Sequence, residues 1–119
     1  MSRHDDLVRL YHMRDYAREA LQIVAHRTRE DLGTDRMFQL ALTRLIEIVG
    51  EAANRVSPDG QAAHPSIPWA KITGMRHRIV HGYDLVDNDI LWKTTIEDLP
   101  PLIAALDEAI ARIETARKT

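Results

Sequence analysis

The hydrophobic positions of this chain recur every three or four residues, which is the spacing of one face of an α-helix. The first apolar stripe runs from Leu7 to Val24. We expect it to form a long helix that ends at Gly33, because glycine is common just beyond a helix C-terminus. No segment shows the strict alternation of apolar and polar residues that a half-buried strand requires. The pattern therefore predicts an all-α fold.

A second helix is predicted to start after Thr34 or Asp35, either of which can cap it, and to run to about Val56. It carries two apolar rows, so it should pack on two sides and lie in the centre of the protein. The rows are Met37, Ala41, Leu45, Ile48 and Ala52, and Phe38, Leu42, Ile46, Val49 and Ala53.

Prolines and glycines divide the remainder of the chain. Ser57-Pro58-Asp59-Gly60 predicts a turn. Pro68 suits the first turn of a third helix, which should end at Gly82. Asp87 can cap a fourth helical segment, and Pro100-Pro101 should bend or restart it. The chain thus predicts a small up-and-down bundle of four to five helices.

Length and composition narrow the picture further. A chain of 119 residues fits one domain, residues 1–119, and it contains no cysteine for disulfides or thiolate metal sites. No stretch is apolar for long enough to span a bilayer, and the N-terminus lacks a signal-peptide core, so we expect a cytoplasmic protein with no membrane partner. With a net charge of −2, the chain cannot bind nucleic acid through an overall positive charge. Any RNA binding must use a local patch, and the densest is Lys71, Arg76, His77 and Arg78.

Arg76 interrupts an otherwise apolar row of the predicted third helix. An unpaired buried guanidinium is costly, so Arg76 must meet a carboxylate, reach solvent or line a cleft. One interpretation is an ion pair with the polar row Glu47, Glu51 and Asn54 of the second helix. A carboxylate that orients the arginine is also compatible with catalysis.

The segment from Arg76 to Tyr83 combines a permanent cation, the imidazole of His81 and a phenol. Arginine binds phosphate through a planar fork of donors, and histidine transfers protons near neutral pH. These groups can cleave an RNA phosphodiester without a metal. Arg76 and His81 lie about 140° apart around an ideal helix, so the arginine must bend round, the helix must distort at Gly82, or a second copy must share the site. A two-fold dimer would bring two arginines and two histidines into one cleft.

The order Arg76, four residues, His81, one residue, Tyr83 resembles the signature of the HepT-like ribonuclease toxins of the HEPN superfamily. The resemblance extends over the whole chain, through the blocks 48–55 and 68–76 before the motif and 86–87, 90–92 and 98–100 after it. Many family members have asparagine after the motif arginine, where this chain has His77. That position is generally polar, so the departure adds a second imidazole and little else.

The resemblance implies a homodimeric HEPN-like bundle that acts as a metal-independent endoribonuclease toxin on cellular tRNA or mRNA, without a cofactor. Arg76 and His81 would be the catalytic residues, with His77, Arg78 and Glu51 in support. It further implies a partner, a minimal nucleotidyltransferase antitoxin of the MntA type, which silences the toxin by transferring AMP to Tyr83.

Two other interpretations stay open. The chain could be a catalytically idle HEPN module that dimerises and docks a nucleotidyltransferase. It could also be a metal hydrolase, because His77 and His81 are four residues apart on the predicted helix, with His64 or Asp84 as a third ligand.

Overall fold

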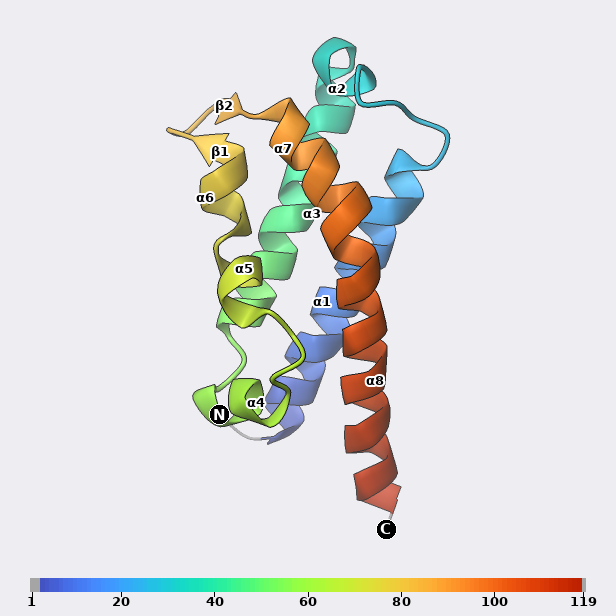
Figure 1. The fold of residues 1–119 in the computed structure, drawn as a ribbon, viewed down its shortest axis with the longest axis vertical. Coiled ribbons are helices and arrows are strands. Elements are labelled where there is room, and N and C mark those ends of the chain that lie inside the picture. The colour runs from blue at the N-terminus through green and yellow to red at the C-terminus, as the bar shows by residue number, and fades with distance from the viewer. Residues whose placement is uncertain (1–2, 119) are drawn as a thin grey trace.

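The computed structural model describes residues 3–118, which form helical segments that run alternately up and down the long axis of the molecule (Figure 1). The described part extends over 51 × 29 × 20 Å. The upward segments are α1 (Arg3–Val24) and the pair α5 (Trp69–Thr73) and α6 (Met75–Ile79). The downward segments are α3 (Arg36–Asn54) and the run formed by α7 (Asn88–Lys93), the π-helical turn η1 (Thr94–Asp98) and α8 (Leu99–Lys118). The fold is the predicted all-α bundle.

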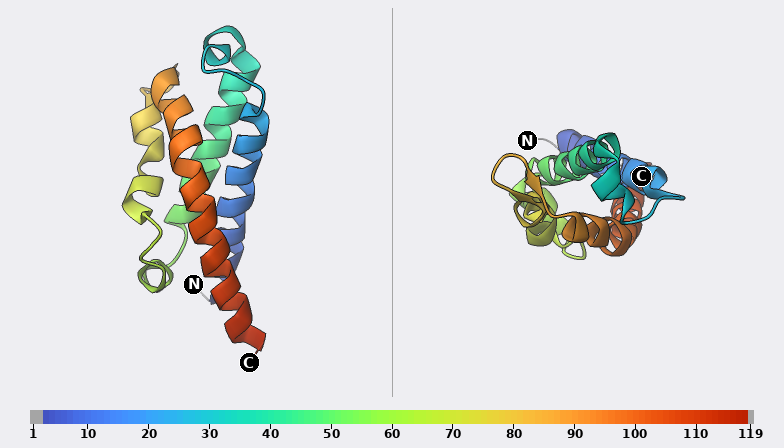
Figure 2. Two further views of the ribbon diagram at one scale, coloured as in Figure 1. Left: turned by 45° about the vertical axis from the view of Figure 1, so that its right-hand side comes forward. Right: turned by 90° about the horizontal axis from the view of Figure 1, so that it is seen from above.

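The core lies between α1, α3 and α8, which surround it when the bundle is viewed along its axis (Figure 2). Their apolar stripes meet there and are almost fully excluded from solvent, as the helical spacing requires. Among the largest buried side chains are Leu10 and Met13 of α1, Leu42 and Ile46 of α3, and Leu102 and Leu106 of α8. No helix among the described residues is both long and apolar enough to cross a membrane.

Asp35 caps α3, as predicted, and accepts a hydrogen bond from the backbone N–H of Phe38 at 3.1 Å. The predicted end of the first helix at Gly33 is wrong. The helix α1 stops at Val24, where His26 takes a left-handed φ of 65°, and Gly33 lies inside the short helix α2 (Asp31–Thr34). The apolar row of α3 that starts at Met37 was predicted to pack along its whole length, but Met37 is 81% exposed.

Two other local predictions need correction. The segment predicted as a turn at Ser57–Gly60 opens the short helix α4 (Pro58–Ala63), because Ser57 caps it and Pro58 fits its first turn. The prolines at 100 and 101 do not restart a separate helix. Proline supplies no N–H, so the preceding turn widens into η1 and α8 continues from it, while Asp87 caps α7 as predicted.

Candidate active site

The predicted third helix is broken twice, and these breaks shape the site. Gly74 separates α5 from α6, and α6 ends at Ile79, three residues before the predicted end at Gly82. The chain then forms the strands β1 (Val80–His81) and β2 (Leu85–Val86). The expectation of no strand is therefore wrong here. Two-residue strands are too short to show an alternating pattern in the sequence.

The two strands form an antiparallel hairpin in which Val80 pairs with Val86 and His81 pairs with Leu85. Gly82 has a φ of 71°, a left-handed conformation that glycine adopts without strain, and it starts the connecting loop. Below the hairpin, the N–H of Asp87 donates to the carbonyl of Ile79 at 2.7 Å. The hairpin therefore carries His81 and Tyr83 away from α6, next to the end of the bundle that also holds α2 (Figure 1).

Arg76 lies on α6 and faces α3, where it meets a carboxylate. Its Nε is 3.5 Å from Oε2 of Glu47, and its side chain is 47% exposed. Glu47 is the more enclosed partner and is also 4.0 Å from Arg44. The guanidinium is thus held on one side and open to solvent on the other. This arrangement satisfies the charge and leaves donors for an incoming anion.

Glu51, which the sequence suggested as a supporting residue, has a different partner. Its Oε1 accepts a hydrogen bond from Nη1 of Arg44 at 3.1 Å. Glu47 and Glu51 are one helical turn apart on the same face of α3, so spacing alone could not distinguish them. The structure places Glu47 beside Arg76 and Glu51 farther along α3.

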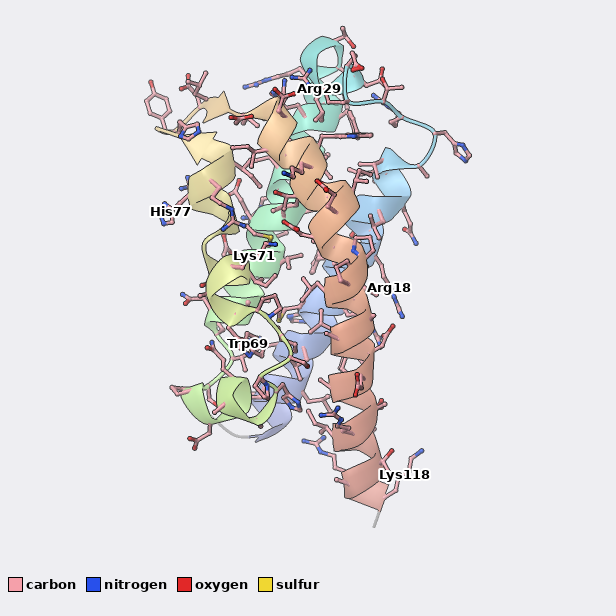
Figure 3. The ribbon with its side chains drawn as sticks, in the orientation of Figure 1. Arg18, Arg29, Trp69, Lys71, His77 and Lys118 are labelled. Atoms are coloured by element: carbon pink, nitrogen blue, oxygen red, sulfur yellow. The ribbon has the colours of Figure 1, made fainter. Side chains whose placement is uncertain are left out.

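The residues of the basic patch predicted from the sequence make different contacts in the structure. His77 points outward from α6 into solvent, in full view in Figure 3. Arg78 donates from Nη2 to the carbonyl of Lys71 at 3.2 Å and so ties α6 back to α5. Lys71 forms an ion pair with Asp98 of η1 at 3.0 Å. His77 and Arg76 are therefore the members of the patch most available to a ligand.

His81 and Tyr83 are both exposed, and Tyr83 is 92% accessible in the hairpin loop. Core packing, the simplest structural role for this tyrosine, does not apply. His81 is exposed on β1 and reaches solvent beside the end of α6. Arg76, His77, His81 and Tyr83 thus lie on consecutive elements, α6, β1 and the hairpin loop, and all four are exposed.

A close contact between α3 and α5 fixes where the motif begins. A Cβ atom added to Gly50 of α3 would lie 3.2 Å from the carbonyl oxygen of Ile72, tighter than most real contacts. Glycine at this position therefore lets the two helices approach each other. Together with the Lys71–Asp98 pair, this contact anchors α5 between α3 and η1. The sequence offered no signal for either contact, because both join distant segments.

The arrangement does not support a metal site. His77 and His81 no longer share a helical face, because α6 ends at Ile79 before His81 is reached. Within residues 3–118, no three histidine, cysteine, aspartate or glutamate side chains converge. The metal-hydrolase interpretation needs a third ligand, so this geometry counts against it.

A cavity of about 710 Å³ lies at the opposite end of the bundle, between the start of α1, α4 and the last turns of α8. Burial, with a contribution from Arg112, lowers the pKa of His64 in its lining. None of the motif residues lines this cavity. Arg76, His77, His81 and Tyr83 are instead exposed on the surface.

The family model described as "Ribonuclease HepT-like" matches residues 13–109 of the chain. A "Probable ribonuclease HepT" of Thermococcus cleftensis is 40% identical over 88 residues, which cover 71% of this chain and 80% of that protein. A "Putative RNase" of Caldanaerobacter subterraneus is 31% identical over 83 residues, 70% of this chain and 74% of the relative. Another "Putative RNase", from Methanocaldococcus jannaschii, is 28% identical over 102 residues, 86% of this chain and 94% of the relative. No solved structure matches the chain significantly.

Proposed function

Because the chain belongs to the HepT-like ribonuclease family, we propose that it is a metal-independent endoribonuclease that acts through Arg76 and His81. The observation that supports these two residues most directly is their shared setting. Both are exposed on consecutive elements, α6 and β1, and Glu47 holds Arg76 without enclosing it. An accessible cation and an accessible imidazole on neighbouring elements suit a reaction in which a phosphate is bound and a proton is moved.

In the proposed mechanism, His81 accepts the proton of a ribose 2′-hydroxyl, and the resulting oxygen attacks the adjacent phosphorus. Arg76 stabilises the negative charge that builds on the phosphate oxygens in the transition state. A second imidazole donates a proton to the departing 5′-oxygen. This imidazole is either His77 of the same chain or His81 of the partner subunit. The bond from phosphorus to that oxygen breaks, which leaves a 2′,3′-cyclic phosphate and a 5′-hydroxyl.

The proposal includes a homodimer, because one chain supplies a single motif histidine to a reaction that needs both a base and an acid. The face of α3 that carries Glu47 adjoins Arg76 of the motif. Met37 and Leu40 of α3 expose large apolar side chains on this face, at 81% and 50%. Exposed apolar side chains of this size suit a protein interface.

The proposal also includes the toxin role on cellular tRNA or mRNA and its control by a minimal nucleotidyltransferase antitoxin. The side chain of Tyr83 is 92% exposed, so its hydroxyl is accessible to such an enzyme. An AMP group on Tyr83 would add bulk and a negative phosphate next to Arg76 and His81. Both would oppose the entry of RNA, by volume and by like charge.

A second candidate function is a HEPN module without nuclease activity that dimerises and docks a nucleotidyltransferase. The exposed apolar side chains of α3 favour it as much as they favour a dimer. Turnover separates the two functions, since the module would bind its partner tightly and cleave nothing.

The central experiment incubates the purified protein with single-stranded RNA in the presence of EDTA and identifies the product ends. We expect cleavage with 2′,3′-cyclic phosphate ends, abolished by Arg76→Ala and by His81→Ala while circular dichroism stays unchanged. Arg112→Ala and His12→Ala, which truncate the same residue types on other exposed surfaces, should cleave at the parental rate. A motif variant that keeps parental activity would overturn the mechanism, and turnover that EDTA stops would support a metal enzyme instead.

A further inference from the structure

The hairpin presents an unusual amount of apolar surface for so short a segment. Of the five large apolar side chains that are exposed among the described residues, Tyr83 and Leu85 both lie on it, at 92% and 66%. Tyr83 is in the loop, and Leu85 pairs with His81 in the β-ladder. Residues paired across a ladder project to the same side of a hairpin. An apolar surface therefore borders the proposed catalytic histidine.

Charge at the hairpin differs from charge on α6. Asp84 follows Tyr83 in the loop and is exposed, so the loop tip carries a negative charge. Arg76 and His77 lie on the neighbouring helix. A phosphate is attracted to the helix and repelled from the loop tip. What the loop tip can accept from an RNA chain is its uncharged part, the base.

We propose that Tyr83, with Leu85 beside it, forms a base-stacking subsite that receives an unpaired nucleobase next to the scissile phosphate. This inference rests on the proposed ribonuclease function and names its substrate class, single-stranded RNA. Aromatic side chains bind bases of any sequence through their π-faces. His81 is the ladder partner of Leu85, so a nucleotide whose phosphate lies at His81 has its base next to the surface of the hairpin.

The geometry also explains why the substrate must be unpaired. In a duplex, both faces of a base are covered by its neighbours, and the bases of A-form RNA are reached only from a shallow groove. A phenol that projects from a loop needs a base that has left the stack. Tyr83 thus selects loops, ends and other single-stranded regions, and it does so without reading a base sequence.

Binding of a short, fully 2′-O-methylated RNA tests this subsite apart from cleavage, because that RNA lacks the attacking hydroxyl. Tyr83→Ala should weaken binding about 5- to 150-fold, the effect expected for one stacked base. Tyr83→Phe keeps the ring and should bind as the parent does. Ile96→Ala, which truncates an apolar side chain of η1 that is 43% exposed, is the matched control and should also bind normally. The same sequence as a duplex should bind weakly to all four proteins.

A scan of single abasic positions in the same oligonucleotide identifies the stacked base. At one position, loss of the base should weaken binding to the parent but not weaken binding to Tyr83→Ala any further. Equal affinity of Tyr83→Ala and the parent would overturn the subsite. So would a result in which every abasic position weakens binding to Tyr83→Ala as much as it weakens binding to the parent. Dissociation of a dimer by Tyr83→Ala, seen by light scattering, would make the tyrosine an interface residue and overturn the subsite as well. A parent that binds no RNA would instead refute the ribonuclease function itself.

Discussion

Glu47 determines where the guanidinium of Arg76 can lie, so its removal should affect the transition state more than RNA binding. Glu47→Gln keeps the shape of the side chain but removes the charge that holds Nε at 3.5 Å. We expect kcat to fall about 10- to 100-fold, as for a small misplacement of a catalytic group, with KM little changed. Steady-state cleavage of a defined RNA measures both constants.

Glu51→Gln is the matched control for Glu47, since Glu51 lies one turn away on α3 and pairs with Arg44 instead. It should leave kcat close to that of the parent. A larger loss for Glu51→Gln than for Glu47→Gln would restore Glu51 as the supporting carboxylate that the sequence suggested.

Tyr83→Phe should separate cleavage from control by the antitoxin. The hydroxyl is needed neither as acid nor as base, so the variant should cleave RNA and yet lack the oxygen that accepts AMP. Intact mass after incubation with a nucleotidyltransferase antitoxin, ATP and magnesium should show AMP additions on the parent alone. Additions that persist on Tyr83→Phe would place the modification on another residue, and an unmodified parent that is still inhibited would indicate control by complex formation.

At the level of elements, the hairpin depends on the left-handed backbone of Gly82. No atom lies within 4 Å of a Cβ added there, so the cost of Gly82→Ala comes from backbone strain alone, about 1–2 kcal/mol. The hairpin can relieve this strain by changing its loop, which would move His81. We expect a marked loss of cleavage with a small loss of unfolding free energy, measured by urea denaturation.

Gly33→Ala controls for the methyl group itself. Gly33 also has no atom within 4 Å of an added Cβ, but it lies in α2 without a positive φ. Alanine there should be neutral or slightly stabilising, because it reduces the freedom of the unfolded chain. A Gly82→Ala protein with full activity would mean that the hairpin conformation is not required for cleavage.

The elements that the sequence predicted correctly are those with strong local signals. Asp35 and Asp87 cap helices because their carboxylates accept the first free N–H groups, a preference visible in any sequence. The hairpin could not be predicted in this way, since its strands are two residues long and its strand residues also fit a helical stripe. Arg76 was expected to meet the polar row of α3. Whether it pairs with Glu47 or with Glu51 depends on the position of α6 along the axis of α3, which tertiary packing determines.

For the whole molecule, a homodimer is expected, and mixing variants tests whether its two chains share each site. Arg76→Ala and His81→Ala proteins should each be inactive. Mixed dimers contain one composite site in which the arginine of one chain meets the histidine of the other, so mixing should restore part of the activity. Light scattering that shows an active monomer, or mixtures that stay inactive although subunits exchange, would contradict a shared site.

Residues 81–85 of the hairpin, which include His81, are all exposed, whereas α1, α3 and α8 share the main core. Regions with few buried contacts open at a lower free energy than the core does. A global melting curve therefore reports on the three long helices and says little about whether the corner that carries His81 is formed. Amide hydrogen exchange at Leu85 to Asp87, followed with and without RNA, reports directly on that corner. If RNA binding orders this segment, its amides should exchange more slowly when RNA is present, while exchange in the rest of the bundle stays unchanged.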